Sequence, residues 1–159
     1  MIRPAQPSDV PTILGFIIDL AVYEREPDAV VATEAGLTEA LFGAQPAVFA
    51  HMAIDDGGAA VGFALWFVTF STWVGRHGIW LEDLYVRPEA RGAGHGLALL
   101  RRLAEIAVER GYGRVEWNVL DWNEPSLRFY RSLGANTLDD WTVHRLDGEA
   151  LAALGRPAS

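Results

Sequence analysis

The amino-acid sequence predicts an α/β fold, an α+β sandwich in which helices flank a mixed sheet, as one domain over residues 1–159. The expected strands and helices follow one another in the order β-α-α-β-β-β-α-β-α-β, without repeats or linkers. The chain of 159 residues is long enough for one sizeable core and short for two domains. Its composition, 50% hydrophobic and 21% charged, is that of an ordinary globular protein.

The N-terminal part begins with a short strand at Ile2–Pro4, which is followed by a helix that lasts to about Tyr23. Ser8 or Asp9 can cap this helix, and Pro11 is tolerated in its first turn. Apolar residues then recur at helical spacing, which predicts an amphipathic helix that buries one face.

A second helix begins at Thr33, and Gly43 ends it. Strands at Ala47–Ile54 and Ala60–Phe70 are joined by residues 55–58, where Asp-Asp-Gly-Gly suits a primed hairpin turn. Hydrophobic periodicity, and glycines that end helices, predict the later elements. They are a loop at Ser71–Gly78, strands at Ile79–Val86, Val115–Leu120 and Trp141–Leu146, and helices at Leu97–Arg110, Glu124–Leu133 and Gly148–Leu154.

The most informative segment joins the strand that ends at Val86 to the helix that begins at Leu97. Pro88 stops the strand, and a loop with glycines at 92, 94 and 96 runs straight into the helix. A helix N-terminus offers unbonded N–H donors and partial positive charge, and glycine lets the backbone approach a ligand closely. The segment therefore predicts a cradle for a diphosphate. It lacks both the third glycine of a dinucleotide fingerprint and the Lys-Ser/Thr of a P-loop.

The formal net charge is −8 and basic residues form no run, so the sequence indicates no nucleic-acid partner and suits cationic ones. There is no cysteine, which excludes disulfides, a cysteine nucleophile and thiolate metal sites. The four His residues lack ligand spacing, so no metal is expected. Because no signal-like start and no apolar run of about 18 residues is found, we expect a cytoplasmic protein without a membrane partner.

The motif Arg91-x-x-Gly94-x-Gly96 follows an apolar strand that ends Leu84-Tyr85-Val86. In this setting the motif resembles the coenzyme A pyrophosphate motif of the GNAT superfamily of acyl-CoA-dependent N-acyltransferases. Residues 121–126 and 129–135 look like the later CoA-contacting segment of that family. The resemblance runs from Ile2 to about Leu146, which is nearly the whole chain.

Three further segments sharpen the resemblance: Tyr23-Glu24, Phe70-Ser71-Thr72-Trp73 and Leu81-Glu82-Asp83. With them the chain is similar to the diamine (spermidine/spermine) and thialysine N-acetyltransferase branch. Ser71 stands where the polyamine enzymes tend to carry an acid, which favours the thialysine-type relatives.

The resemblance implies a mixed, mostly antiparallel sheet flanked by helices, and acetyl-CoA as the cosubstrate. The backbone of residues 84–86 would pair with the pantetheine arm and aim an N–H at the thioester oxygen. His95 stands where an apolar residue is common, but its backbone N–H still serves the cradle. The residues implied in cofactor binding are Leu84, Tyr85, Val86, Arg91, Gly92, Ala93, Gly94, His95, Gly96, Leu97, Asn123, Pro125, Ser126 and Tyr130.

Acetyl transfer requires that an alkylammonium group, with a pKa near ~10, lose a proton. The resemblance implies that Glu82 faces the acceptor amine and takes this proton directly or through water; the alternative is an exposed glutamate in a salt bridge. Asp83 is expected to alternate to the opposite face of the strand. Tyr130 is the candidate acid for the leaving thiolate, and a core aromatic whose hydroxyl reaches solvent is the alternative. Without a cysteine or a nucleophile turn, direct attack in a ternary complex is expected.

The candidates for acceptor binding are Tyr23, Glu24, Trp73 and Glu82, because acids and aromatic rings suit an ammonium group. For Glu24, an ordinary surface acid at a helix end is equally consistent. Asn123 is expected to cap its helix and to bind the pantetheine or the acceptor. We expect a small primary amine as acceptor (a diamine, polyamine or thialysine-like amino acid) and a homodimer. The alternatives are a protein or peptide N-acetyltransferase and a non-catalytic CoA-binding module.

Overall fold

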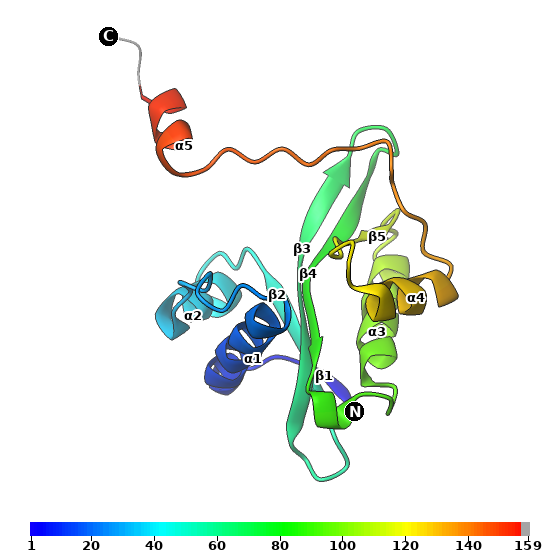
Figure 1. The fold of residues 1–159 in the computed structure, drawn as a ribbon. Helices are drawn as coiled ribbons and strands as arrows, with labels where there is room; N and C mark the ends of the chain where they lie inside the picture. Colours follow the sequence, from blue (N-terminus) through cyan, green and yellow to red (C-terminus); the bar gives the residue numbers. More distant parts are fainter. Residues whose placement is uncertain (157–159) are drawn as a thin grey trace. The chain divides into compact units, whose positions relative to one another are not determined.

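Figure 1 shows the fold in a computed structural model, which describes residues 1–156. The chain divides into two compact units, Met1–Leu120 and a second one that begins at Asp121. The first unit contains a five-stranded sheet in which spatial order follows chain order. The strands are β1 (Ile2–Pro4), β2 (Phe49–Ile54), β3 (Ala60–Ser71), β4 (Arg76–Val86) and β5 (Val115–Glu116).

The first four strands pair antiparallel, and β5 pairs parallel to β4. The predicted fold class, a mixed and mostly antiparallel sheet flanked by helices, is therefore confirmed. Helices α1 (Val10–Tyr23) and α2 (Glu34–Phe42) lie on one face of the sheet, and α3 (His95–Glu109) lies on the other (Figure 1). Thr33, where the sequence predicted the helix to begin, is the N-cap of α2, and its side chain accepts a hydrogen bond from Gly36 N–H at 3.1 Å.

The larger part of the core lies between the sheet and the helices α1 and α2. Its buried members are Ile13, Phe16, Leu41, Ala50, Met52, Ile54, Phe63, Leu65 and Tyr85. On the opposite face, α3 buries Leu99, Leu103 and Ile106. Both faces of the sheet are thus covered, which explains why the central strands read as continuous apolar runs.

The hairpin of β3 and β4 is longer than the sequence indicated. The expected loop at Ser71–Gly78 is wrong, because the two strands pair as far as Ser71 and Arg76. Only residues 72–75 form the turn, in which Gly75 adopts a φ of 68° and Ser71 Oγ accepts from Val74 N–H at 3.3 Å. Side chains near this tip have few neighbours to bury them, and Trp73 is 87% exposed.

Strand β4 contains a β-bulge at Glu82. The register passes from Leu65 opposite Asp83 to Trp66 opposite Leu81, so Glu82 has no counterpart on β3. A bulge inserts one residue into a strand, bends it and shifts the side-chain alternation from that point on. The face that each later residue of β4 presents is therefore set by the bulge and not by strict alternation.

Strand β5 is shorter than the predicted strand at Val115–Leu120. It pairs with β4 only at Ile79 and Trp80, and this pairing ends just before the bulge. Because the bulge bends β4, a straight neighbour cannot follow it further. Within the described residues, the outer edge of β4 from Leu81 to Val86 carries no strand.

The second unit contains α4 (Glu124–Ser132) and α5 (Gly148–Leu154), both close to their predicted positions. Asn123 caps α4, since its side-chain oxygen accepts from Ser126 N–H at 3.4 Å. The predicted strand at Trp141–Leu146 is wrong: residues 141–146 are assigned to no strand or helix. They have a strand-like sequence, but a strand needs a neighbour with which to pair. No helix within residues 1–156 is long and apolar enough to cross a membrane.

Candidate functional site

The glycine-rich loop turns β4 into α3 through two left-handed residues. Gly92 and Gly94 have φ angles of 81° and 85°, which residues with a Cβ adopt only with strain. Gly94 is the N-cap residue of α3, and no side chain caps the helix there. The main chain is therefore exposed at the point where the helix begins.

The N–H groups at this helix start are not used by the protein. The first intrahelical bond of α3 is donated by Ala98 N–H to Gly94 O at 2.9 Å. Within residues 1–156, the N–H groups of residues 92–97 donate to no backbone or side-chain acceptor. Together they form a row of open donors at the positive end of a helix, which is an arrangement that binds phosphate.

Gly96 is not explained by the fold alone. Its φ lies outside the left-handed region, and a Cβ added there would meet only Val86 Cγ2, at an ordinary contact distance of 3.9 Å. A glycine in the first turn of a helix costs stability relative to alanine. At this position, the lack of a side chain leaves space beside the exposed N–H groups at the start of α3.

The outer edge of β4 leads to this helix start. Residues 84–86, the expected pantetheine-binding stretch, lie on the part of β4 that has no β5 neighbour. One acceptor on this stretch is already engaged, because Arg91 Nε donates to Val86 O at 2.9 Å. The remaining backbone groups of such an edge can pair with an extended ligand in the manner of an added strand.

Glu82 and Asp83 lie on the same face of the sheet, and the expectation that they would alternate to opposite faces is wrong. The bulge at Glu82 is the physical reason. Asp83 is opposite the core residue Leu65, on the side of α1 and α2. Glu82 Oε2 accepts a hydrogen bond from the indole Nε1 of Trp80 at 2.9 Å, and Trp80 is opposite Phe67 on that same side.

Glu24 at the end of α1 completes a group of three carboxylates with Glu82 and Asp83. Burial, and then the charges of Glu82 and Glu24, raise the pKa of Asp83 to about 6. Burial also raises the pKa of Glu24. A cluster of acids that are costly to ionise beside one another favours a cationic ligand, and perturbed acids are typical of functional sites.

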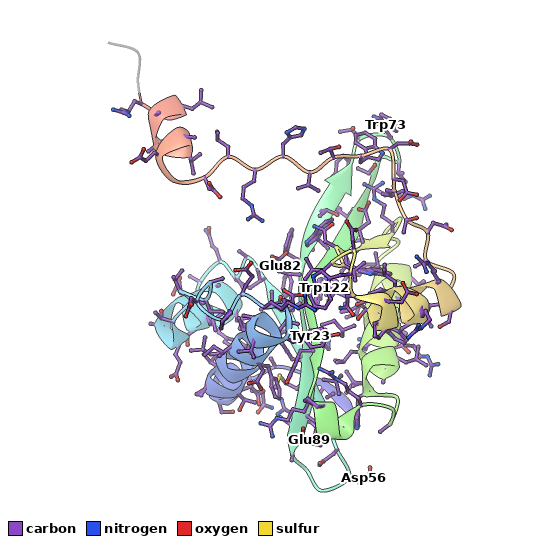
Figure 2. The ribbon with its side chains drawn as sticks, viewed as in Figure 1. Tyr23, Asp56, Trp73, Glu82, Glu89 and Trp122 are labelled. Atoms are coloured by element: carbon purple, nitrogen blue, oxygen red, sulfur yellow. The ribbon has the colours of Figure 1, made fainter. Side chains whose placement is uncertain are left out.

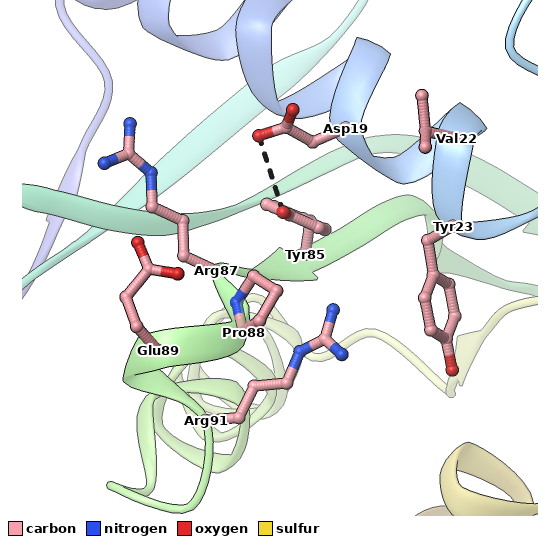
Figure 3. A pocket seen from close by; sticks show the side chains of 8 residues that line it. All are labelled: Asp19, Val22, Tyr23, Tyr85, Arg87, Pro88, Glu89 and Arg91. Atoms are coloured by element: carbon pink, nitrogen blue, oxygen red, sulfur yellow. Dashed lines mark hydrogen bonds between the residues drawn. The ribbon is translucent and has the colours of Figure 1, made fainter.

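A cavity of about 530 Å³ lies on the same side of the sheet, between α1 and the end of β4 (Figure 3). Its walls include Asp19 and Tyr23 of α1, Tyr85 of β4, and Glu89 and Arg91 of the following loop. The Arg91 guanidinium carbon lies 5.1 Å from the ring centre of Tyr23 and 5.9 Å from that of Tyr85. The side chain of Arg91 thus turns towards α1, while its backbone belongs to the glycine-rich loop.

The remaining site candidates are not assigned to this group. Trp73 lies at the tip of the β3–β4 hairpin, away from Glu82 (Figure 2). Asn123, Pro125, Ser126 and Tyr130 belong to the second unit. There Asn123 is buried as the cap of α4, and Tyr130 is half-buried with its ring 5.4 Å from that of Phe129.

Sequence reasoning missed Asp19, Trp80 and Asp83. A signal existed for two of them. Asp19 precedes Tyr23 by four residues on a helix, and Trp80 precedes Glu82 by two residues on a strand, so each pair shares a face. No local signal separates Asp83 from an alternating strand residue, because the bulge depends on pairing with β3. Within residues 1–156, no group of three or more His, Asp or Glu has an arrangement that could hold a metal ion.

Comparisons with known proteins place these features in a family. The model of the acetyltransferase (GNAT) family matches residues 14–135. Thialysine N-epsilon-acetyltransferase of Bos taurus is 37% identical over 97% of this chain and 96% of its own length. L-ornithine N5-acetyltransferase of Arabidopsis thaliana is 32% identical over 98% of this chain and 87% of its own length. The solved structure of an integron cassette protein from the mobile metagenome of V. cholerae covers 99% of this chain and 98% of its own, with 27% identity and a TM-score of 0.81.

Proposed function

The chain belongs to the acetyltransferase (GNAT) family, and we propose that it transfers the acetyl group of acetyl-CoA to a primary amine of a small molecule. The observation that carries this proposal is the row of open N–H groups at residues 92–97, beside a strand edge without a partner. Two relatives are named for thialysine and L-ornithine, which are amino acids with an amino group at the end of the side chain. A small acceptor of this class is therefore favoured over a protein or peptide acceptor and over a non-catalytic CoA-binding module.

Acetyl-CoA is held chiefly by main-chain groups. The N–H groups of residues 92–97 donate to its pyrophosphate, and Gly96 leaves room for the phosphate oxygens. The edge of residues 84–86 pairs with the pantetheine arm. From the second unit, Asn123, Pro125, Ser126 and Tyr130 are proposed to complete the binding site, as the family resemblance implies.

The chemistry is a direct transfer in a ternary complex. The amine nitrogen forms a bond to the thioester carbonyl carbon, and the carbon–sulfur bond breaks. Glu82, whose carboxylate is oriented by Trp80, takes the proton that the ammonium loses, directly or through water. Tyr130 gives a proton to the leaving thiolate. After the bond to carbon has formed, the attacking nitrogen loses its second proton, and this proton restores the Tyr130 hydroxyl. Glu24 and Tyr23 are proposed to bind the acceptor, which is cationic before it loses that proton. Trp73, at the tip of the β3–β4 hairpin away from Glu82, is not part of this proposal.

We also propose that residues 1–159 form a single acyltransferase domain and that the protein is a cytoplasmic homodimer. The family match at residues 14–135 crosses from the first compact unit into the second, which supports one functional domain. The apolar side chains that residues 138–146 expose support a second copy as partner.

The decisive experiment is an assay of free-thiol release from acetyl-CoA with ornithine, lysine, 1,4-diaminobutane, spermidine and a short lysine peptide. We expect thiol release with small amines and a mass increase of one acetyl group on the acceptor. If acetyl-CoA raises the melting temperature but no amine releases thiol, the protein binds the cosubstrate without catalysis and the proposal fails.

The variant Glu82→Gln tests the proposed base. We expect it to lower kcat by about a hundredfold or more, in the range that loss of a general base usually costs. Acetyl-CoA should still raise the melting temperature of this variant, because Glu82 takes no part in the phosphate cradle. Glu149→Gln, an exposed acid on α5, is the matched control and should keep wild-type kcat. Equal kcat values for the two variants would remove Glu82 from the mechanism.

A further inference from the structure

We propose that the cavity beside Tyr85 binds the amino-acid end of the acceptor, with the Arg91 guanidinium on its α-carboxylate and Asp19 on its α-ammonium. This inference rests on the proposed function and names the acceptor class, a zwitterionic amino acid whose side chain carries the amine to be acetylated. It also separates the two halves of Arg91. The backbone belongs to the cofactor cradle, while the side chain serves the acceptor.

Arg91 is held in a position suited to bind an anion. Its guanidinium lies over the rings of Tyr23 and Tyr85, and its Nε is anchored on Val86 O at 2.9 Å. Among the described residues, the two terminal nitrogens of Arg91 have no hydrogen-bond or ion-pair partner. A guanidinium whose Nε is fixed presents its outer nitrogens as a pair, and two parallel N–H groups match the two oxygens of a carboxylate.

Asp19 provides the opposite charge within reach of the same ring. Its Oδ2 accepts from the Tyr85 hydroxyl at 3.4 Å, so Asp19 and Arg91 both lie against Tyr85 (Figure 3). Burial and the neighbouring Asp19 carboxylate raise the pKa of Tyr85, so this phenol stays neutral and remains a donor. One cation and one anion beside a shared aromatic wall complement the two charges of an α-amino acid.

The charge balance of the cavity distinguishes an amino acid from a polyamine. Two arginines, Arg87 and Arg91, and two acids, Asp19 and Glu89, line it. Equal numbers of both signs suit a zwitterion, whereas the end of a polyamine would require an excess of acids. The excess of acid lies further along the sheet, at Glu24, Glu82 and Asp83, where the amine to be acetylated would arrive as a cation.

The separation of these two regions fits such an acceptor. Tyr85 and Asp83 lie on the same face of β4, two residues apart, which is roughly 7 Å at the rise of a strand. The side chain of ornithine or lysine spans four or five single bonds from the α-carbon to the amine, about 5–6 Å when extended. An amino acid anchored beside Tyr85 can therefore place its terminal amine next to Asp83 and Glu82.

The test compares kcat/KM for ornithine, for 1,4-diaminobutane, which lacks its carboxylate, and for 5-aminopentanoate, which lacks its α-amine. In Arg91→Gln we expect the ratio of kcat/KM for ornithine over 1,4-diaminobutane to fall about tenfold or more, since a charge-assisted hydrogen bond is lost. In Asp19→Asn the ratio of ornithine over 5-aminopentanoate should fall instead. Arg101→Gln, an exposed arginine on α3, is the charge-matched control and should leave both ratios at the wild-type value.

The alternative ligand for Arg91 is a phosphate of acetyl-CoA. In that case Arg91→Gln lowers kcat/KM for all three acceptors by the same factor and raises the Kd for acetyl-CoA, which overturns the inference. If the wild-type protein uses ornithine and 1,4-diaminobutane equally well, this inference fails while the proposed function stands. If none of the three acceptors releases thiol while spermidine does, this inference fails and the proposed function stands. If no amine of the whole panel releases thiol, both proposals fail.

Discussion

At the scale of single residues, Asp83 stands out because its environment opposes its charge. Burial acts first, and the neighbouring carboxylates Glu82 and Glu24 act in the same direction, so the pKa of Asp83 rises to about 6. A strand position that only supported the fold would be better filled by a neutral residue. We infer that the acid is retained for an ammonium group, whose charge would stabilise the ionised carboxylate in the complex.

Replacing Asp83 by Asn is therefore expected to stabilise the protein without ligand. Above pH 6, Asp83 is ionised in both the folded and the unfolded chain. The difference between its pKa of about 6 in the folded protein and its ordinary pKa of 3.8 then costs the folded state roughly 3 kcal/mol. Below the pKa that Asp83 has in the unfolded chain, this carboxyl is protonated in both states and the cost vanishes. Urea unfolding should show Asp83→Asn more stable than wild type at pH 8, and this advantage should shrink as the pH falls through 6 towards 4. An advantage that stays constant with pH would contradict the assignment.

Glu82 and Asp83 also show how far a sequence can be read at this scale. The family resemblance, together with the residue type, identified Glu82 as a candidate. The shared face of Glu82 and Asp83 could not be predicted, because a bulge is a property of two paired strands and leaves no mark in one of them. The same holds for Arg91, whose contact with Tyr23 joins two segments far apart in the chain.

At the scale of elements, the start of α3 combines a poor helix sequence with an open row of donors. Gly92 and Gly94 are required by their left-handed φ angles, whereas Gly96 meets no such requirement. Gly15 in the middle of α1 is comparable, since a Cβ there would meet nothing within 4 Å. The two positions therefore separate the effect of glycine on helix stability from its effect on ligand access.

We expect Gly96→Ala to leave stability unchanged or to raise it by up to about 1 kcal/mol, because alanine favours a helix. The same variant should weaken acetyl-CoA binding about tenfold or more, since the added methyl group keeps the phosphate from the N–H groups. Gly15→Ala is the control, with a similar gain in stability and an unchanged Kd. Titration calorimetry and thermal unfolding measure both quantities. An unaltered Kd in Gly96→Ala would place the pyrophosphate elsewhere.

Elements were predictable where the signal is local. The start of α2 near Thr33 and the position of the turn at residues 55–58 follow from side-chain and glycine chemistry within a few residues. The primed type expected for this turn is wrong, because Gly58, with a φ of 86°, is its only residue in the left-handed region. The ends of β4 and β5 were not predictable, because the length of a strand is set by how far its neighbour can follow. Residues 141–146 illustrate the extreme case, because they have a pattern typical of a strand and are assigned to none.

At the scale of the whole molecule, the proposed homodimer gives residues 138–146 a role. Leu138, Trp141 and Val143 are 64%, 68% and 74% exposed. Large apolar side chains that follow one another along an extended segment are typical of an interaction surface. A second copy of the chain would supply the neighbour that the strand-like sequence requires.

The dimer prediction is tested by a charge placed in this segment. We expect the wild-type protein to sediment with the mass of two chains, and Val143→Asp to shift this equilibrium towards the mass of one. Val31→Asp is the matched control, because Val31 is 90% exposed in a different part of the chain. Sedimentation of the wild type as a monomer at micromolar concentration would contradict the homodimer, and an equal loss of mass in both variants would implicate general destabilisation.

The order of strands and helices as far as α4, the glycine-rich entrance to α3 and the family to which they point were determined by the sequence alone. Caps, turns and apolar periodicity act over a few neighbouring residues, so one chain read in order contains them. Only the tertiary structure decided that Glu82 and Asp83 share a face, that β5 leaves the edge of β4 open, and that Arg91 turns towards Tyr23. These features arise from contacts between segments distant in sequence, where pairing register and packing, and not local preference, set the direction of each side chain.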